Sequence, residues 1–174
     1  MKLPGIIATA LLLLVGCTGV PDGIEPVRNF DQERYLGTWY EIARLDHSFE
    51  EGLSQVTAEY TQNDDGSIRV LNRGYHQADG RWQEAEGRAL FVDNHSIGHL
   101  KVSFFGPFYS SYVVFDLDES YSRAYISGYN RNYLWLLSRT PQVSDAELEA
   151  FKSRASAAGF NLDELIIVDQ PTTR

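Results

Sequence analysis

The chain is poor in cysteine and methionine, with one residue of each among 174. A single cysteine excludes an internal disulfide, and it excludes the multi-cysteine sites that hold structural zinc. Basic residues are also scarce, because 15 Lys and Arg stand against 24 Asp and Glu, for a formal net charge of −9. This balance argues against a nucleic-acid partner, which requires a basic surface, and against electrostatic docking on anionic lipid. Apolar residues make up 43% of the chain, which excludes wholesale disorder.

Long apolar runs are equally scarce, since one such run is present and it lies at the N-terminus, from Leu3 to Val15. A comfortable membrane span needs about 20 apolar residues, so this run is too short for one. Residues 1–16 instead have the length and order of a secretory signal peptide, with Lys2 ahead of the apolar stretch. We therefore expect the first sixteen residues to be a targeting segment.

The cysteine stands directly after this run, in the sequence Leu14-Val15-Gly16-Cys17. These residues resemble the lipobox of bacterial lipoproteins, in which small residues precede a cysteine. The resemblance implies cleavage before Cys17 and acylation of its thiol and of the new amino group. Thr18 stands where lipoproteins retained in the inner membrane typically carry Asp. The resemblance thus implies a lipid anchor in the outer membrane, with the protein at its periplasmic face; the alternative is an ordinary signal peptide with an incidental cysteine.

Residues 17–29 are expected to be the lipidated N-terminus and a tether, ahead of a folded domain over residues 30–174. The segment Thr18–Asn29 contains two Gly and two Pro and shows no hydrophobic periodicity, which is typical of a linker. Its twelve residues reach roughly 40 Å when fully extended at about 3.3 Å each. A tether of that length allows the domain either to stand clear of the membrane or to lie on it.

From residue 34 onward the chain alternates apolar and polar side chains in short segments that turn signals separate. Asn63–Gly66 and Gln77–Gly80 have the sequences of hairpin turns, and Gly106-Pro107 ends a further segment. With the segment around Trp39, the pattern contains eight strands, and short strands at this spacing predict a sandwich or a barrel. We expect an all-β fold, an eight-stranded antiparallel up-and-down β-barrel, which is wide enough to hold one small ligand.

One segment has a convincing helical pattern. Ser144–Glu147 has the sequence of a capping box, Leu148, Phe151 and Ala155 recur at helical spacing, and Gly159 follows as a C-terminal stop. We expect one C-terminal helix over residues 146–157, packed on the outside of the barrel. It should cover some of the apolar residues of outward parity, and the remainder could form a dimer surface. These outward residues are Leu71, Phe105, Val113, Phe115, Leu134 and Leu136.

Two motifs resemble signatures of the lipocalin family. Tyr35–Ile42 contains Gly37-x-Trp39, as in the first signature, and Leu134–Pro141 contains Arg139 at the end of the last barrel strand, as in the third. The resemblance implies that Arg139 packs on the Trp39 ring and closes the base of the barrel. It thus implies a structural role for Gly37, Trp39 and Arg139. The second signature is degraded to Leu117-Asp118-Glu119, which favours the bacterial outer-membrane branch over the mammalian carriers.

This branch implies a binding protein without a cofactor and without enzymatic activity. Its expected ligand is a lysophospholipid or a fatty acid, stored or transported for maintenance of the cell envelope, with a role under stress. The resemblance further implies that the protein can form a homodimer. Two alternatives stay open at this point, a lipid-modifying enzyme and a scaffold lipoprotein with a filled barrel.

Strand parity predicts which side chains line the interior and bind the ligand. Tyr60 and Tyr112 are the members of this set that could hydrogen-bond a ligand head group. The alternative is that the same residues fill a solid core. The predicted lining residues are Val56, Ala58, Tyr60, Ile68, Val70, Ala85, Ala89, Phe91, Val102, Phe104, Tyr112, Val114, Trp135 and Leu137.

Motifs that carry catalysis or bind metals are missing from the sequence. It contains no His-Glu-x-x-His, nucleophile elbow or phosphate-binding loop. His95 and His99 lie in one Gly-containing segment without a clear third ligand, so no metal site is predicted. The segment Gly106–Tyr109 should place Phe108 and Tyr109 at a barrel rim, either in contact with the membrane or folded back over the interior.

Overall fold

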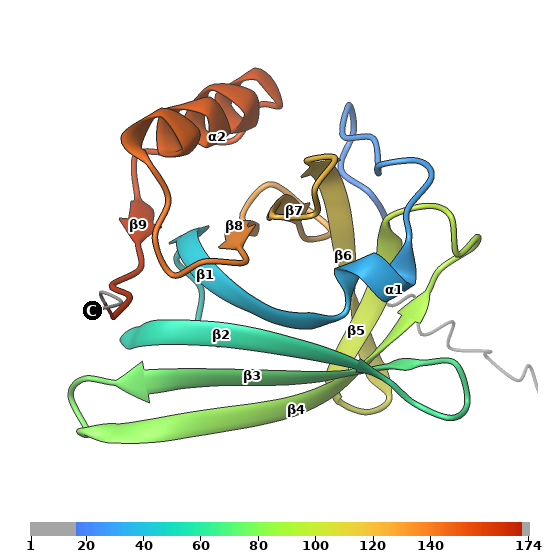
Figure 1. Cartoon of the computed structure of the whole chain (residues 1–174), viewed down its shortest axis with the longest axis horizontal. Helices are drawn as coiled ribbons and strands as arrows, with labels where there is room; N and C mark the ends of the chain where they lie inside the picture. The colour runs from blue at the N-terminus through green and yellow to red at the C-terminus, as the bar shows by residue number, and fades with distance from the viewer. Residues whose placement is uncertain (1–16, 172–174) are drawn as a thin grey trace, which may run out of the picture.

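The computed structural model describes residues 17–171, so the predicted signal peptide and the last three residues lie outside the described part. Nine strands form one antiparallel sheet in the order β2-β3-β4-β5-β6-β7-β8-β1-β9, and β1 also pairs with β2 (Figure 1). This extra pairing closes the first eight strands into a barrel and confirms the predicted fold class. The strands are β1 (Gly37–Leu45), β2 (Leu53–Gln62), β3 (Ile68–His76), β4 (Arg81–Phe91), β5 (His99–Phe105), β6 (Phe108–Leu117), β7 (Arg123–Ser127), β8 (Leu134–Ser138) and β9 (Leu165–Ile167).

Because the barrel strands follow one another up and down, successive turns lie at opposite ends. We call the end with the β1–β2, β3–β4, β5–β6 and β7–β8 turns the mouth, and the other end the base. The short helix α1 (Gln32–Tyr35) immediately precedes β1 and lies at the base (Figure 1). Asp31 caps it, since its carboxylate accepts a hydrogen bond from the Arg34 backbone N–H at 3.2 Å.

Helix α2 (Asp145–Ala157) packs on the outer wall of the barrel, close to the predicted boundaries (Figure 1). Its capping box is complete, because Ser144 accepts from the Glu147 backbone N–H and Glu147 accepts from the Ser144 backbone N–H. Phe151 and Ala155 are fully buried in a cluster outside the barrel that also contains Val113, Phe115, Leu134 and Leu136. Of the outward apolar residues, Leu71 is not part of this cluster, and Phe105 is 72% exposed.

The segment predicted to be a tether lies along the barrel in the structure. The Cys17 carbonyl accepts a hydrogen bond from the Ser111 backbone N–H at 2.8 Å, and Ile24 is buried in the outer cluster. Further along, the Val27 backbone N–H donates to the Val114 carbonyl at 2.8 Å. Composition alone suggested a free linker because Gly and Pro prevent regular structure, but they do not prevent irregular backbone from docking on a strand edge.

The barrel wall is incomplete on one side of the mouth. Strand β4 is longer than its partner, so residues 88–91 pair with β5 whereas residues 81–86 pair only with β3. Ala85, which was predicted to line the interior, is consequently exposed. At Gly87 a Cβ atom would lie 2.8 Å from the Phe104 ring, so only glycine allows this aromatic side chain to lie over the β4 backbone.

Candidate functional site

The barrel interior is lined by one apolar cluster, and the predicted lining residues other than Val56 and Ala85 all belong to it. Val56 is also buried, at 2% exposure, and it packs over Gly74 of β3. A Cβ atom at Gly74 would lie 3.2 Å from Val56 Cγ2. The cluster contains further residues that are not in the predicted lining set. These are Val27, Phe30, Tyr35, Leu36, Trp39, Leu100, Leu117, Tyr121, Ala124 and Ile126.

Arg139 closes the base of the barrel through contacts with Trp39 and with backbone carbonyls. The Arg139 guanidinium lies 4.0 Å from the centroid of the Trp39 ring, which is the packing that the family signature implies. The Trp39 indole N–H donates to the Tyr35 carbonyl at 2.9 Å. Gly37 has φ 97°, and a Cβ atom there would lie 3.3 Å from Arg139 Nη1, so glycine is required at this position. Arg139 also donates hydrogen bonds to the carbonyls of Arg34, Leu36, Thr38 and Tyr121.

Three tyrosine hydroxyls form a chain inside the barrel. The Tyr112 hydroxyl lies 2.6 Å from that of Tyr35 and 2.9 Å from that of Tyr60. Burial raises the pKa of all three phenols above the ordinary value, so they remain protonated at physiological pH. Tyr60 and Tyr112, which were predicted to bind a head group, therefore already spend part of their hydrogen-bonding capacity on each other and on Tyr35.

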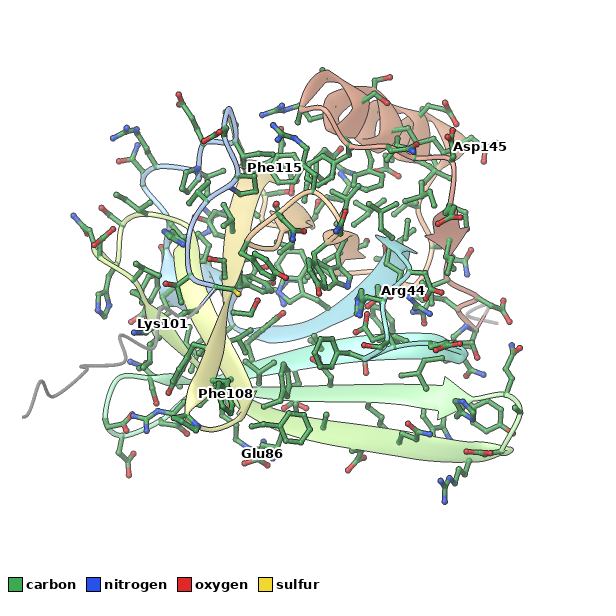
Figure 2. The ribbon with its side chains drawn as sticks, turned by 180° about the vertical axis from the view of Figure 1, so that it is seen from behind. Arg44, Glu86, Lys101, Phe108, Phe115 and Asp145 are labelled. Carbon is green, nitrogen blue, oxygen red and sulfur yellow. The ribbon has the colours of Figure 1, made fainter. Side chains whose placement is uncertain are left out.

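A charged cluster faces the interior between the tyrosines and the mouth. Glu41 and Arg44 of β1 form an ion pair with 2.7 Å between Nη1 and Oε1, and both are buried. Arg44 Nη2 also donates to the Glu50 carbonyl at 2.8 Å, and Glu50 comes from the β1–β2 turn at the mouth. The Glu50 carboxylate accepts from the Trp135 indole at 3.0 Å and lies 3.0 Å from His47 Nε2. This cluster joins β1, β8 and the mouth turn; Figure 2 shows Arg44 at the end of β1.

The two carboxyl groups of this cluster have opposite pKa shifts. Burial and the charge of Glu50 raise the pKa of Glu41 well above its ordinary value. Burial also acts to raise the pKa of Glu50, but contacts with His47, Trp135 and Arg44 outweigh it and lower that pKa. Of the two carboxyl groups, Glu41 is therefore the one whose protonated form burial favours.

Sequence reasoning missed this cluster because a β-bulge changes the parity of β1. The register shifts between Glu41 and Ala43, so Glu41 and Arg44 both face inward although they are three residues apart. The available signal was a charged residue two positions after Trp39 on the inward face. Buried polar atoms without a hydrogen-bond partner among the described residues include Arg44 Nε and, on the inward face of β3, Asn72 Oδ1.

The interior wall remains partly accessible. The inward-facing apolar residues of β4, β5, β6 and β8 include side chains that are only partly buried, although they pack on the interior cluster. A solid core would bury them fully. These partly buried residues are Phe91, Val102, Phe104, Tyr112 and Trp135.

A separate surface hollow of about 290 Å³ lies outside the barrel, between β6, β7 and α2. Arg123 and Glu147 line it and form an ion pair, and Asp116 and Asp118 are also in its wall. Charged walls of this kind do not suit an apolar ligand. The barrel interior is therefore the candidate site.

Comparison with known proteins agrees with this geometry. The sequence pattern of the lipocalin-like domain matches residues 30–170. The chain belongs to the lipocalin family. Outer membrane lipoprotein Blc of Vibrio cholerae is 58% identical to this lipocalin over 91% of the chain and 94% of the relative. The protein of the same name from Escherichia coli K12 is 49% identical over 94% of each.

More distant relatives and solved structures extend the likeness. Apolipoprotein D of Macaca fascicularis is 30% identical over 92% of this lipocalin and 93% of its own chain. Insecticyanin from Manduca sexta has a TM-score of 0.69 at 19% identity, covering 88% of this lipocalin and 87% of that chain, and the cockroach allergen Per a 4 has 0.68 at 21%, covering 88% and 96%. At such identities the structures show the fold alone.

These relatives confirm the predicted family and the predicted localisation in the outer membrane. Among residues 17–171, no helix has the length and apolar character that a membrane crossing requires. The lipocalin fold and the outer-membrane lipoprotein relatives support a role in binding a lipid or another small hydrophobic molecule.

Proposed function

We propose that this lipocalin binds single-chain amphipathic lipids, lysophospholipids or fatty acids, and stores or transports them at the outer membrane for envelope maintenance. The observation that carries the proposal is the partly accessible apolar wall inside a closed barrel. An acyl chain would cover the half-buried side chains of β4, β5 and β6, and each buried CH₂ would contribute about 0.8 kcal/mol.

Buried polar groups of the interior suit the other end of such a ligand. Arg44 Nε and Asn72 Oδ1 are buried without hydrogen-bond partners among residues 17–171, so a donor and an acceptor remain to be satisfied there. A head group that enters as far as the charged cluster can meet Arg44, whereas a pure hydrocarbon cannot hydrogen-bond with either group. This arrangement favours an amphipathic ligand over a fully apolar one.

The anchor is part of the same proposal. Cys17 is a free, exposed thiol in the polypeptide and stands at the predicted cleavage site. We propose that acyl groups on Cys17 hold the protein on the periplasmic face of the outer membrane. The names of the Blc relatives, which call them outer membrane lipoproteins, support this assignment.

Native mass spectrometry of the purified mature protein tests the proposal. A single-chain lipid bound at one molecule per barrel is the expected result, both as isolated and after incubation with lysophosphatidylethanolamine or palmitate. Chemical turnover of that lipid would instead indicate an enzyme. A barrel that binds neither lipid would contradict the proposal and favour the scaffold alternative.

A further inference from the structure

Exposed aromatic side chains lie at three of the turns that connect the strands at the mouth of the barrel. Among residues 17–171, the large hydrophobic side chains with substantial exposure are Phe49, Trp82, Phe105 and Phe108 at the mouth turns, and Ile167 on β9. The β5–β6 tip ends level with Glu86 of β4 (Figure 2), so Phe105 and Phe108 lie well short of Trp82 and the β3–β4 turn. Exposed apolar side chains that stand next to one another mark contact surfaces.

The most exposed pair lies at the tip of the β5–β6 hairpin. Phe105 and Phe108 are cross-strand partners on either side of Gly106-Pro107, and they are 72% and 69% exposed. Figure 2 shows Phe108 at the outer end of this hairpin, away from the helix. Cross-strand partners have Cβ atoms about 4.5–5.5 Å apart, so the two rings form one small apolar projection. Aromatic rings of this kind are favoured at the boundary between water and lipid.

The site of the proposed lipid anchor lies next to this tip. Cys17 forms a β-bridge with Ser110, and the Ser111 hydroxyl donates to the Gly19 carbonyl at 2.6 Å, which holds the start of the mature chain on β6. Ser110 is two residues from Phe108, or roughly 7 Å along a strand. Acyl chains on Cys17 would therefore leave the protein beside the aromatic tip, not at the end of a long tether.

We propose that the tip of the β5–β6 hairpin, residues 105–108, inserts into the surface of the bilayer that holds the acyl chains of Cys17. The barrel is then fixed with one edge of its mouth against the membrane. Ligand can pass between the bilayer and the barrel interior along that edge with little exposure to water. This inference rests on the proposed lipid anchor and goes beyond it by assigning an orientation.

A bilayer fits this surface better than a protein partner does. Stable protein interfaces bury about 1,200–2,000 Å² in total and need complementary shape. A projection of two aromatic rings around Gly106-Pro107 is far smaller, but a lipid surface accepts it without a matching pocket. The formal charge of −9 makes apolar contact the better mode, and Lys101, with Nζ 5.3 Å from the Tyr109 ring, adds a local positive charge.

Spin labelling of the acylated protein tests the orientation. Because Cys17 is the only cysteine and its thiol would carry an acyl chain, Gly106→Cys introduces one free thiol. A Cβ atom at Gly106 meets nothing within 4 Å, so a label fits there. Asp64→Cys, in the exposed β2–β3 turn at the base, is the matched control. Both proteins are reconstituted in vesicles of phosphatidylethanolamine and phosphatidylglycerol.

The spin label at position 106 should collide readily with dissolved oxygen, which enters the bilayer, and should be protected from a water-soluble nickel complex. This pattern is expected at the depth of about 5–10 Å that interfacial apolar faces reach. The label at position 64 should show the reverse. If position 106 is as accessible to nickel as position 64, or shows dipolar broadening from a second labelled copy, the membrane orientation is wrong.

A second set of variants separates the tip from the anchor. Adding Phe105→Ser and Phe108→Ser to Gly106→Cys should return the label to water, whereas Ile167→Ser, which removes an exposed apolar side chain elsewhere, should not. Uptake of a fluorescent fatty acid in detergent should be unchanged in both. If the wild-type protein does not take up the fluorescent fatty acid, the proposed function is wrong. If the label remains protected from the nickel complex after both phenylalanines are replaced, only the role of the tip is wrong.

Discussion

Replacement of Arg139 by methionine should open the base of the barrel without changing its ligand. Arg139 donates four hydrogen bonds to backbone carbonyls and lies 4.0 Å from the Trp39 ring centroid. Methionine has a similar length and keeps the apolar contact with the indole. It loses every hydrogen bond and the charge, so the substitution isolates the polar contribution.

The magnitude follows from which bonds are sheltered. Two of the four, to Leu36 and Tyr121, are partly buried, and two are exposed, where water can replace the guanidinium. At about 1.5–3 kcal/mol for each sheltered bond to a charged group, discounted for partial exposure, the loss is roughly 2–4 kcal/mol. For a domain of this size, each kcal/mol shifts the melting midpoint by about 2–4 °C, so we expect a decrease of roughly 5–15 °C.

Thermal unfolding followed by circular dichroism measures this decrease. Arg139→Lys should recover little, because an ammonium cannot reach several diverging carbonyls at once. Arg88→Met is the matched control, since Arg88 forms an exposed ion pair with Asp65 and its loss should change the midpoint only slightly. If Arg139→Met lowers the midpoint no more than Arg88→Met does, the base closure does not depend on Arg139. Affinity for a fluorescent fatty acid should be retained in all three folded variants.

Three further predictions concern the interior, the anchor and the buried carboxyl pair. Ala89→Trp, at a buried inward position, should abolish fatty-acid uptake at a folding cost of about 1–3 kcal/mol, whereas the exposed Ala157→Trp should preserve uptake; equal uptake would contradict the assigned interior. Cys17→Ser should release folded protein from the outer-membrane fraction, and a variant that still sediments with that fraction would contradict the anchor. Because the folded-state pKa of Glu41 is raised, its stabilising contribution is lost as pH rises through that pKa. Urea unfolding should therefore show Glu41→Gln gaining stability relative to wild type as the pH rises above the ordinary range for a glutamate, whereas a constant difference would contradict the raised pKa.

Period-two alternation carried most of the fold prediction because it is a local property. In a strand, successive side chains point to opposite faces whatever the distant partner is, so the inward set on β2, β3, β5 and β6 could be read from the chain. The capping box at Ser144 and the helical spacing of Phe151 and Ala155 are local in the same sense. Gly37 and Trp39 identified the family because a positive φ and a buried indole at the base require those residue types.

The sequence by itself thus determined the number of barrel strands, the faces of most of them and the outer helix. The tertiary structure decided what depends on register between distant strands. The bulge after Glu41 turned Arg44 inward, the early end of β5 left Ala85 exposed, and docking on Ser111 placed Cys17 beside the aromatic tip. Each of these is a pairing between segments far apart in the chain, and neither segment alone specifies it.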